Sequence, residues 1–150
     1  PAGYEPSEAN ITALLDPANV KWKHLLSENI EVPTRWEKED FDKADLAWQK
    51  ERRRLNDRVA ELRRGGAPEE EVKVAEREYD RRDREHTLKM HEYLEAGKYA
   101  GKVGVFEGAG YASTGLYRPM TDCIMFTKGT REFCVVCREA MVGIIDWYSR

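Results

Sequence analysis

The sequence has few of the residues from which a large hydrophobic core is made. Only 41% of its 150 residues are hydrophobic, and 35% are charged. A typical globular domain of this length carries more apolar material, so we expect part of the chain to stay solvated. No apolar run approaches the roughly 18 residues that a membrane-spanning helix requires, so we expect no transmembrane segment.

The sequence also lacks a large excess of charge of either sign. Its formal net charge is −3, which gives no electrostatic reason to expect binding to nucleic acid or to an anionic membrane. The first ten residues, PAGYEPSEAN, contain neither the basic region nor the apolar region of a signal peptide. We therefore predict no signal peptide within them.

Charged residues concentrate between positions 35 and 95, where the pattern is helical. Apolar and aromatic residues recur every seven positions in two series: Phe41, Trp48, Leu55 and Leu62, then Val72, Tyr79, His86 and Tyr93. Between the series lies RRGGAPEEE, whose glycines suit a helix end and whose proline and glutamates suit the next helix's first turn. We predict an antiparallel helical hairpin over residues 35–97, either a solvated arm or a docking arm for a partner.

The two flanking segments have a different texture. Residues 1–34 contain four prolines (Pro1, Pro6, Pro17 and Pro33) and are predicted to form an extended wrapping segment. Residues 98–150 predict a strand through Val103 and Val105, a glycine turn at 108–110 and a second extended piece ending at Pro119. The predicted fold class is therefore α+β, mostly α.

A helix is predicted from about residue 133 to residue 148. One of its faces is apolar, formed by Cys137, Ala140, Met141, Ile144, Ile145 and Tyr148, so we expect the helix to be buried. A two-stranded ribbon with one helix is too small to form an independent core. A partner chain or further sequence is therefore expected to cover this helix.

Two stretches resemble known motifs but lack a required part. GAGYAS after the first strand is close to a dinucleotide-binding fingerprint, yet the chain continues to Pro119 rather than into a helix. HEYLE begins like the zinc motif H-E-x-x-H, but Glu95 stands where the second histidine is needed, and His86 lies five residues before His91. We predict neither nucleotide binding nor zinc binding at these stretches.

All three cysteines lie close together in the sequence, at Cys123, Cys134 and Cys137. A C-x-x-C pair with a third cysteine before it suits a three-thiolate zinc site that takes a fourth ligand from elsewhere. The spacing equally suits a disulfide from Cys123 to Cys134 or Cys137, or three buried free thiols. A redox pair is disfavoured because no buried parallel strand is predicted before the C-x-x-C.

Three stretches together resemble the IgA-peptidase-type zinc metallopeptidases, family M64. They are VKWKHLL (20–26), KVGVFEGAGYASTGLYRPMTDCIM (102–125) and FCVVCREA (133–140), and they resemble the C-terminal portion that follows the family's zinc-binding helix. The resemblance implies a zincin-like (metzincin-like) catalytic domain with the hairpin inserted in it. It also implies a secreted or periplasmic endopeptidase in which Zn²⁺ activates water, with the remainder of the peptidase domain and a protein or peptide substrate as partners.

The resemblance also assigns a role to particular residues. Met125 resembles the methionine that lies beneath the metal-ligating histidines of metzincins, and Cys123 resembles a residue that anchors this turn, with an oxidising compartment favouring a disulfide there. The family's H-E-x-x-H ligands are not found in the sequence, and His24, His86 and His91 do not replace them. We therefore expect zinc to be bound by residues outside this chain, and the isolated chain to be inactive.

Glu107, Tyr111 and Arg118 are weaker candidates for a substrate cleft. The glycines of EGAGY allow backbone to approach an extended substrate, and Tyr111 offers a phenol to a developing oxyanion. Arg118 offers a guanidinium to a substrate carboxylate or, structurally, to Asp122.

An alternative function is a non-catalytic interaction module. In this interpretation the hairpin binds a protein partner and the three cysteines hold structural zinc. In both interpretations Trp22, Trp36 and Trp147 are expected to anchor the core.

Overall fold

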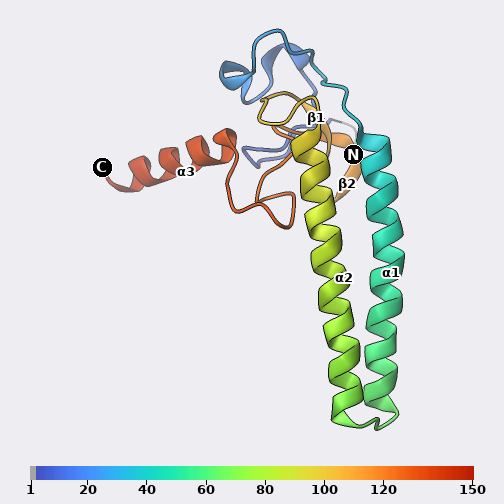
Figure 1. Ribbon diagram of the computed structural model, residues 1–150. Helices are drawn as coiled ribbons and strands as arrows, with labels where there is room; N and C mark the ends of the chain where they lie inside the picture. Colours follow the sequence, from blue (N-terminus) through green and yellow to red (C-terminus); the bar gives the residue numbers. More distant parts are fainter. Residues whose placement is uncertain (1–2) are drawn as a thin grey trace.

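A computed structural model describes residues 3–150. Its elements in chain order are α1 (Lys38–Arg64), α2 (Glu69–Ala96), β1 (Phe106–Ala109), β2 (Ala112–Arg118) and α3 (Val135–Tyr148), preceded by short 3₁₀ turns at Pro17–Asn19 and Lys23–Leu25. The fold is α+β and mostly helical, as predicted. A long hairpin extends from one side of a small body, and α3 points away from that body in another direction (Figure 1). No helix among the described residues is long and apolar enough to cross a membrane.

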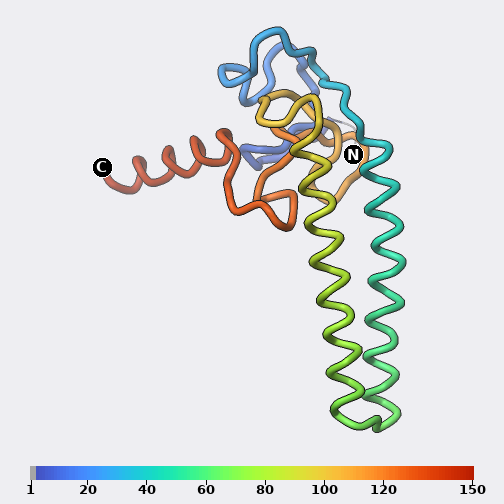
Figure 2. The backbone as a smooth tube through the Cα atoms, viewed as in Figure 1, coloured from blue at the N-terminus to red at the C-terminus, as the bar shows by residue number. Residues whose placement is uncertain are grey.

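Helices α1 and α2 form the predicted antiparallel hairpin and lie side by side along their length (Figures 1 and 2). The two predicted stripes face each other, because the Trp48 ring stacks on the His86 ring with centroids 5.0 Å apart, and Phe41 packs against Tyr93. The buried residues of the hairpin are Leu55, Val72, Ala75, Met90 and Leu94. This apolar seam holds the arm together.

The hairpin turn follows the predicted chemistry with one small difference. Gly66 takes the left-handed φ of +68° that ends the helix, and the Ala67 N–H donates to the Leu62 carbonyl. Pro68 was predicted at the first helical position of the second helix, but it lies at the N-cap of α2, which begins at Glu69. The exposed charges mostly pair along one helix, as Arg81 does with Glu78 and Glu85, and such surface pairs add little stability.

The core of the body joins segments that are far apart in the sequence. Trp22 is buried, and its Nε1 donates to the Gly104 carbonyl over 2.7 Å. The Thr34 N–H donates to the Val105 carbonyl, and the Val105 N–H donates to Thr34 Oγ1. Residues 20–34 therefore contact the segment that leads into β1 at several points along their length.

Strands β1 and β2 form a two-stranded antiparallel ribbon, with Phe106 opposite Arg118 and a bulge between Glu107 and Ala109. The prediction placed the first strand too early, because Val103 and Val105 precede β1. Both valines are buried, but the intervening Gly104 donates its N–H to the Pro119 carbonyl and has no room for a side chain. The turn lies at Gly110–Tyr111 and not at Gly108.

Helix α3 forms where it was predicted and is mostly exposed within this chain, so its burial by a partner chain or further sequence stays a prediction. Only Val136 and Cys137 in its first turn are buried. Its exposed apolar residues include Met141, Val142, Ile144, Ile145, Trp147 and Tyr148. The physical reason is that the helix points away from the body (Figure 2), so Trp147 is 74% exposed and does not anchor the core as expected.

We predict that the hairpin loses stability in mild acid because of His86. Burial lowers the pKa of His86 by more than Asp45 and Asp83 raise it. Since protonation is then easier in the unfolded chain, the stabilisation by neutral His86 is complete above about pH 6.5 and is lost as the pH falls below that value. Thermal unfolding followed by circular dichroism at pH 8 and pH 5 measures this difference.

The His86→Phe variant keeps an aromatic ring against Trp48 but cannot titrate, so its unfolding should change less with pH than that of the parent. His24→Gln serves as the control because His24 is exposed on the body. An equal pH dependence in the parent and in His86→Phe would contradict the assignment.

Candidate functional site

Residues Cys123–Phe126 form a tight turn between β2 and α3. The Cys123 carbonyl accepts hydrogen bonds from the backbone N–H groups of Phe126 and Thr127, at 2.8 and 2.9 Å. The Ile124 N–H donates to the carbonyl of Glu132, which lies outside the turn. Met125 lies within this turn and is 58% exposed, so an apolar side chain is presented to solvent on a backbone that is held from several sides.

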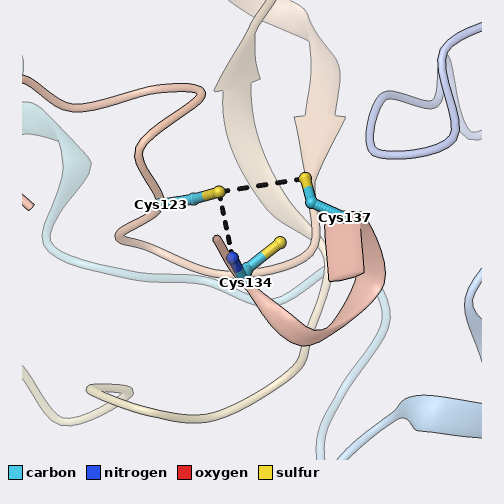
Figure 3. Close-up of side chains that lie close together, drawn as sticks. All are labelled: Cys123, Cys134 and Cys137. Atoms are coloured by element: carbon cyan, nitrogen blue, oxygen red, sulfur yellow. Dashed lines mark hydrogen bonds between the residues drawn. The ribbon is translucent and has the colours of Figure 1, made fainter. Parts of the chain in front are cut away.

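The three cysteines lie close together, with Cys123 at the start of this turn and Cys134 and Cys137 at the start of α3 (Figure 3). Their sulfur atoms all lie within 4.8 Å of one another, and all three residues are buried. The sulfurs of Cys123 and Cys137 lie 3.8 Å apart, and the Cys134 N–H donates to Cys123 Sγ over 3.2 Å. All three are free thiols in the structure, and a disulfide or a bound metal ion at these residues stays a prediction.

The position of the cysteines follows from the start of α3. Cys134 is the N-cap residue of this helix, and Cys137 lies in its first turn. A hydrogen bond from Cys134 lowers the pKa of Cys123 well below its usual range, whereas burial raises the pKa of Cys137. The C-x-x-C pair thus does begin a helix, although no strand of the ribbon leads into it.

A second set of contacts ties the turn to α2. Asp122 accepts a hydrogen bond from Thr127 Oγ1 and lies 3.0 Å from His91 Nδ1. His91 Nε2 in turn lies 3.3 Å from Glu95. HEYLE was not predicted to bind zinc, and the contact between His91 and Asp122 was not predicted from the sequence. Only the contact between His91 and Glu95 has a signal in the sequence, which is their i,i+4 spacing on one helix.

Arg118, at the end of β2, is the most deeply buried charged residue of the body. It is 6% exposed, and burial lowers its pKa to about 10. Its guanidinium carbon lies 5.1 Å from the ring centre of Trp36 and 5.4 Å from that of Phe126. Nε and Nη2 have no hydrogen-bond partner among the described residues. The structural pairing with Asp122 is not formed, because that carboxylate is bonded to Thr127 and His91.

The other two cleft candidates lie along the ribbon. The Glu107 carboxylate accepts a hydrogen bond from the Gly115 N–H over 3.1 Å, which gives it a structural role within the ribbon. Tyr111 lies at the ribbon turn with a φ of +63° and a fully exposed ring. Tyr111 lines the same groove as Arg118, and Glu107 does not line it.

The described residues do not form a catalytic zinc site. His24 pairs with Glu139, His86 lies near Asp45, and His91 lies between Asp122 and Glu95. Within residues 3–150 the cysteines are the one group of three or more side chains that is close enough to hold a metal ion.

Helix α3 leaves apolar side chains uncovered, and Met125 is exposed on a turn that backbone hydrogen bonds hold in place. The family model of IgA peptidase M64 matches residues 1–145. The chain therefore belongs to the IgA peptidase M64 family, which is the family that its sequence resembles. No curated protein matches the chain.

We predict that Asp122 stabilises the turn. Replacing Asp122 by Ala removes the partner of Thr127 and His91, which are partly buried, and should lower the free energy of unfolding by about 1–3 kcal/mol. Urea denaturation measures this change. Asp146→Ala on exposed α3 is the matched control, and it should change the free energy by less than about 0.5 kcal/mol. Equal losses in the two variants would show that the network does not support the turn.

Proposed function

We propose that the chain is the C-terminal portion of a secreted or periplasmic zinc-dependent endopeptidase. In this proposal it supplies the methionine turn beneath the zinc ligands and one wall of the substrate cleft. The observation that carries the proposal is Met125, an apolar side chain left exposed on a turn that many contacts hold in place. Family membership over residues 1–145 supports it, and export rests on the resemblance alone.

The proposal gives the exposed thioether a function. A methionine side chain is apolar and adaptable, so it packs under histidine rings without competing as a hard metal ligand. The zinc ion, held by residues outside this chain, would polarise the peptide carbonyl and activate water. In the proposal, the turn holds Met125 at a fixed position beneath the zinc ligands. The hydrogen bonds to the Cys123 carbonyl and the contact between Asp122 and His91 support the turn in this position.

The exposed face of α3 supports the same proposal. A helix that is apolar on several sides is usually buried in a larger protein, and large exposed apolar patches mark surfaces that are covered in the assembled protein. Ile144, Ile145 and Trp147 are all largely exposed. In the proposal they pack against the remainder of the peptidase domain.

For the cysteine cluster, the geometry favours a structural metal ion over the disulfide that an oxidising compartment suggested. Sulfurs that share a tetrahedral zinc ion at about 2.3 Å lie about 3.8 Å apart, which is the separation between Cys123 and Cys137. The Cys134 sulfur lies within 4.8 Å of both of these sulfurs. The fourth ligand would be water or a group outside residues 3–150. Such an ion would fix the methionine turn to the start of α3.

We expect the full-length protein to retain a zinc ion on this cluster in addition to the catalytic one. Cys137→Ser should remove one zinc per chain in elemental analysis after dialysis, and should leave the second zinc in place. Ser149→Ala, at the exposed end of α3, is the control. A loss of about 2 Da against the reduced mass, with Cys123 bonded to another cysteine, would instead establish the disulfide.

Activity tests the main proposal. The full-length protein should hydrolyse denatured casein, and chelation of its metal should abolish this hydrolysis. Met125→Ala should lower kcat/KM or zinc affinity by about 10- to 100-fold, as expected for a group that supports metal ligands. Leu88→Ala on the exposed hairpin should have no effect. Chelator-resistant hydrolysis, or no hydrolysis by zinc-loaded protein, would sink the proposal and favour a non-catalytic module.

A further inference from the structure

A groove of about 800 Å³ lies between the hairpin and the loop that follows Met125. Helices α1 and α2 form one side, and Phe126–Lys128 and Tyr111 form the other. Arg118 also lines it, buried but with one guanidinium edge unpartnered. The groove therefore combines an aromatic lining with a fixed positive charge.

A buried guanidinium without hydrogen-bond acceptors is rare and costly. The rings of Trp36, Phe41 and Phe126 surround Arg118 at 5.1 to 5.9 Å. Cation–π contacts of this kind hold the group in place, but they do not satisfy its N–H donors. The position is thus preorganised for an acceptor that the described residues do not provide.

The nearby carboxylates are already bonded elsewhere. Asp122 is bonded to Thr127 and His91, as described above. Asp42 accepts a hydrogen bond from Lys38 one turn before it in α1. Both carboxylates attract Arg118 through space, yet neither forms an ion pair with it. An acceptor from another molecule would therefore not have to displace an existing partner of Arg118.

We propose that Arg118 binds a carboxylate of the peptide substrate, so that the groove is an acidic-residue subsite of the peptidase. The planar guanidinium suits a carboxylate because two parallel N–H groups can donate to its two oxygens. The aromatic walls, Trp48 and Phe126 among them, would enclose the apolar stem of the bound residue. This inference rests on the proposed function, since Phe126 directly follows the methionine that would lie beneath the zinc ligands.

Charges along the groove favour an anionic ligand over a cationic one. Arg52 and Arg53 line it beside Arg118. Two acidic residues line it, of which Asp83 is paired with Lys128 and Asp45 accepts a hydrogen bond from Gln49. The four cationic side chains of the lining, which include Lys128, outnumber these two carboxylates. The net charge of the groove lining is thus positive. Arg118 is buried, so bulk water screens its charge less than that of the exposed arginines.

Peptide binding to the full-length protein tests the proposal without requiring hydrolysis. Four fluorescein-labelled pools of otherwise neutral peptides carry either Glu or Gln and have either a free or an amidated C-terminus. Fluorescence polarisation should show that loss of the recognised carboxylate weakens binding by about 10- to 100-fold. The Glu/Gln comparison reports a side-chain carboxylate, and the free/amidated comparison reports the chain terminus.

Arg118→Met separates substrate binding from a structural role. If the guanidinium awaits a ligand, the unliganded variant should be at least as stable as the parent, because an unsatisfied buried charge has been replaced by an apolar group of similar length. Its affinity for the carboxylate peptides should nevertheless fall to that of the amide peptides. Arg118→Lys keeps the positive charge but loses the two parallel N–H donors, so it should retain only part of the preference for carboxylate peptides over amide peptides. Arg64→Met, at the exposed tip of the hairpin, is the control.

Two outcomes would overturn the inference. Equal binding of all four pools by the parent protein would show that the groove does not recognise a carboxylate. A large loss of stability in Arg118→Met and in Arg118→Lys, with the peptide preference unchanged, would show that a carboxylate from the remainder of the domain already pairs with Arg118. Neither outcome depends on casein hydrolysis, so the subsite and the peptidase proposal can fail separately.

Discussion

The small body of the protein depends on a crossing of chain segments at Gly104, whose carbonyl accepts a hydrogen bond from Trp22. At this point the N-terminal segment, the start of the ribbon and the segment after β2 meet. Gly104 also donates to the Pro119 carbonyl, and a Cβ on it would lie 2.6 Å from Thr34 Oγ1. Close approach of three backbones compensates for the scarcity of apolar residues, because buried peptide groups pair with one another and a large tryptophan fills the remaining space.

Arg118 and the turn that carries Met125 both lie on the stretch of chain that continues from this crossing. Strand β2 ends in Arg118, and the next residue, Pro119, accepts the hydrogen bond from Gly104. This bond fixes the chain a few residues before the turn at Cys123–Phe126. The turn is then held from two further directions, by the cysteines at the start of α3 and by His91 on α2. The hairpin is therefore more than a solvated arm, because its α2 helix braces the turn and both of its helices line the groove.

Periodicity predicted the parts of the fold that local forces determine. The hairpin, its turn at Gly66 and the helix after Cys134 follow from apolar spacing and from end residues, which act within a few positions. The C-x-x-C spacing brings Cys134 and Cys137 onto one helix turn, whereas the approach of Cys123 to them depends on the fold. The early placement of the first strand came from reading Val103 and Val105 as an alternating pattern, when Gly104 between them is required by tertiary contact.

What the sequence did not reveal depends on distant contacts. No local rule shows that His91 reaches Asp122, or that Asp122 is thereby unavailable to Arg118. The two open features of the chain also differ in kind. An exposed apolar helix needs only a surface of suitable shape, and many surfaces meet that need. A buried guanidinium needs an acceptor with the right geometry and charge, which far fewer groups provide, so Arg118 constrains its missing partner more tightly than α3 does.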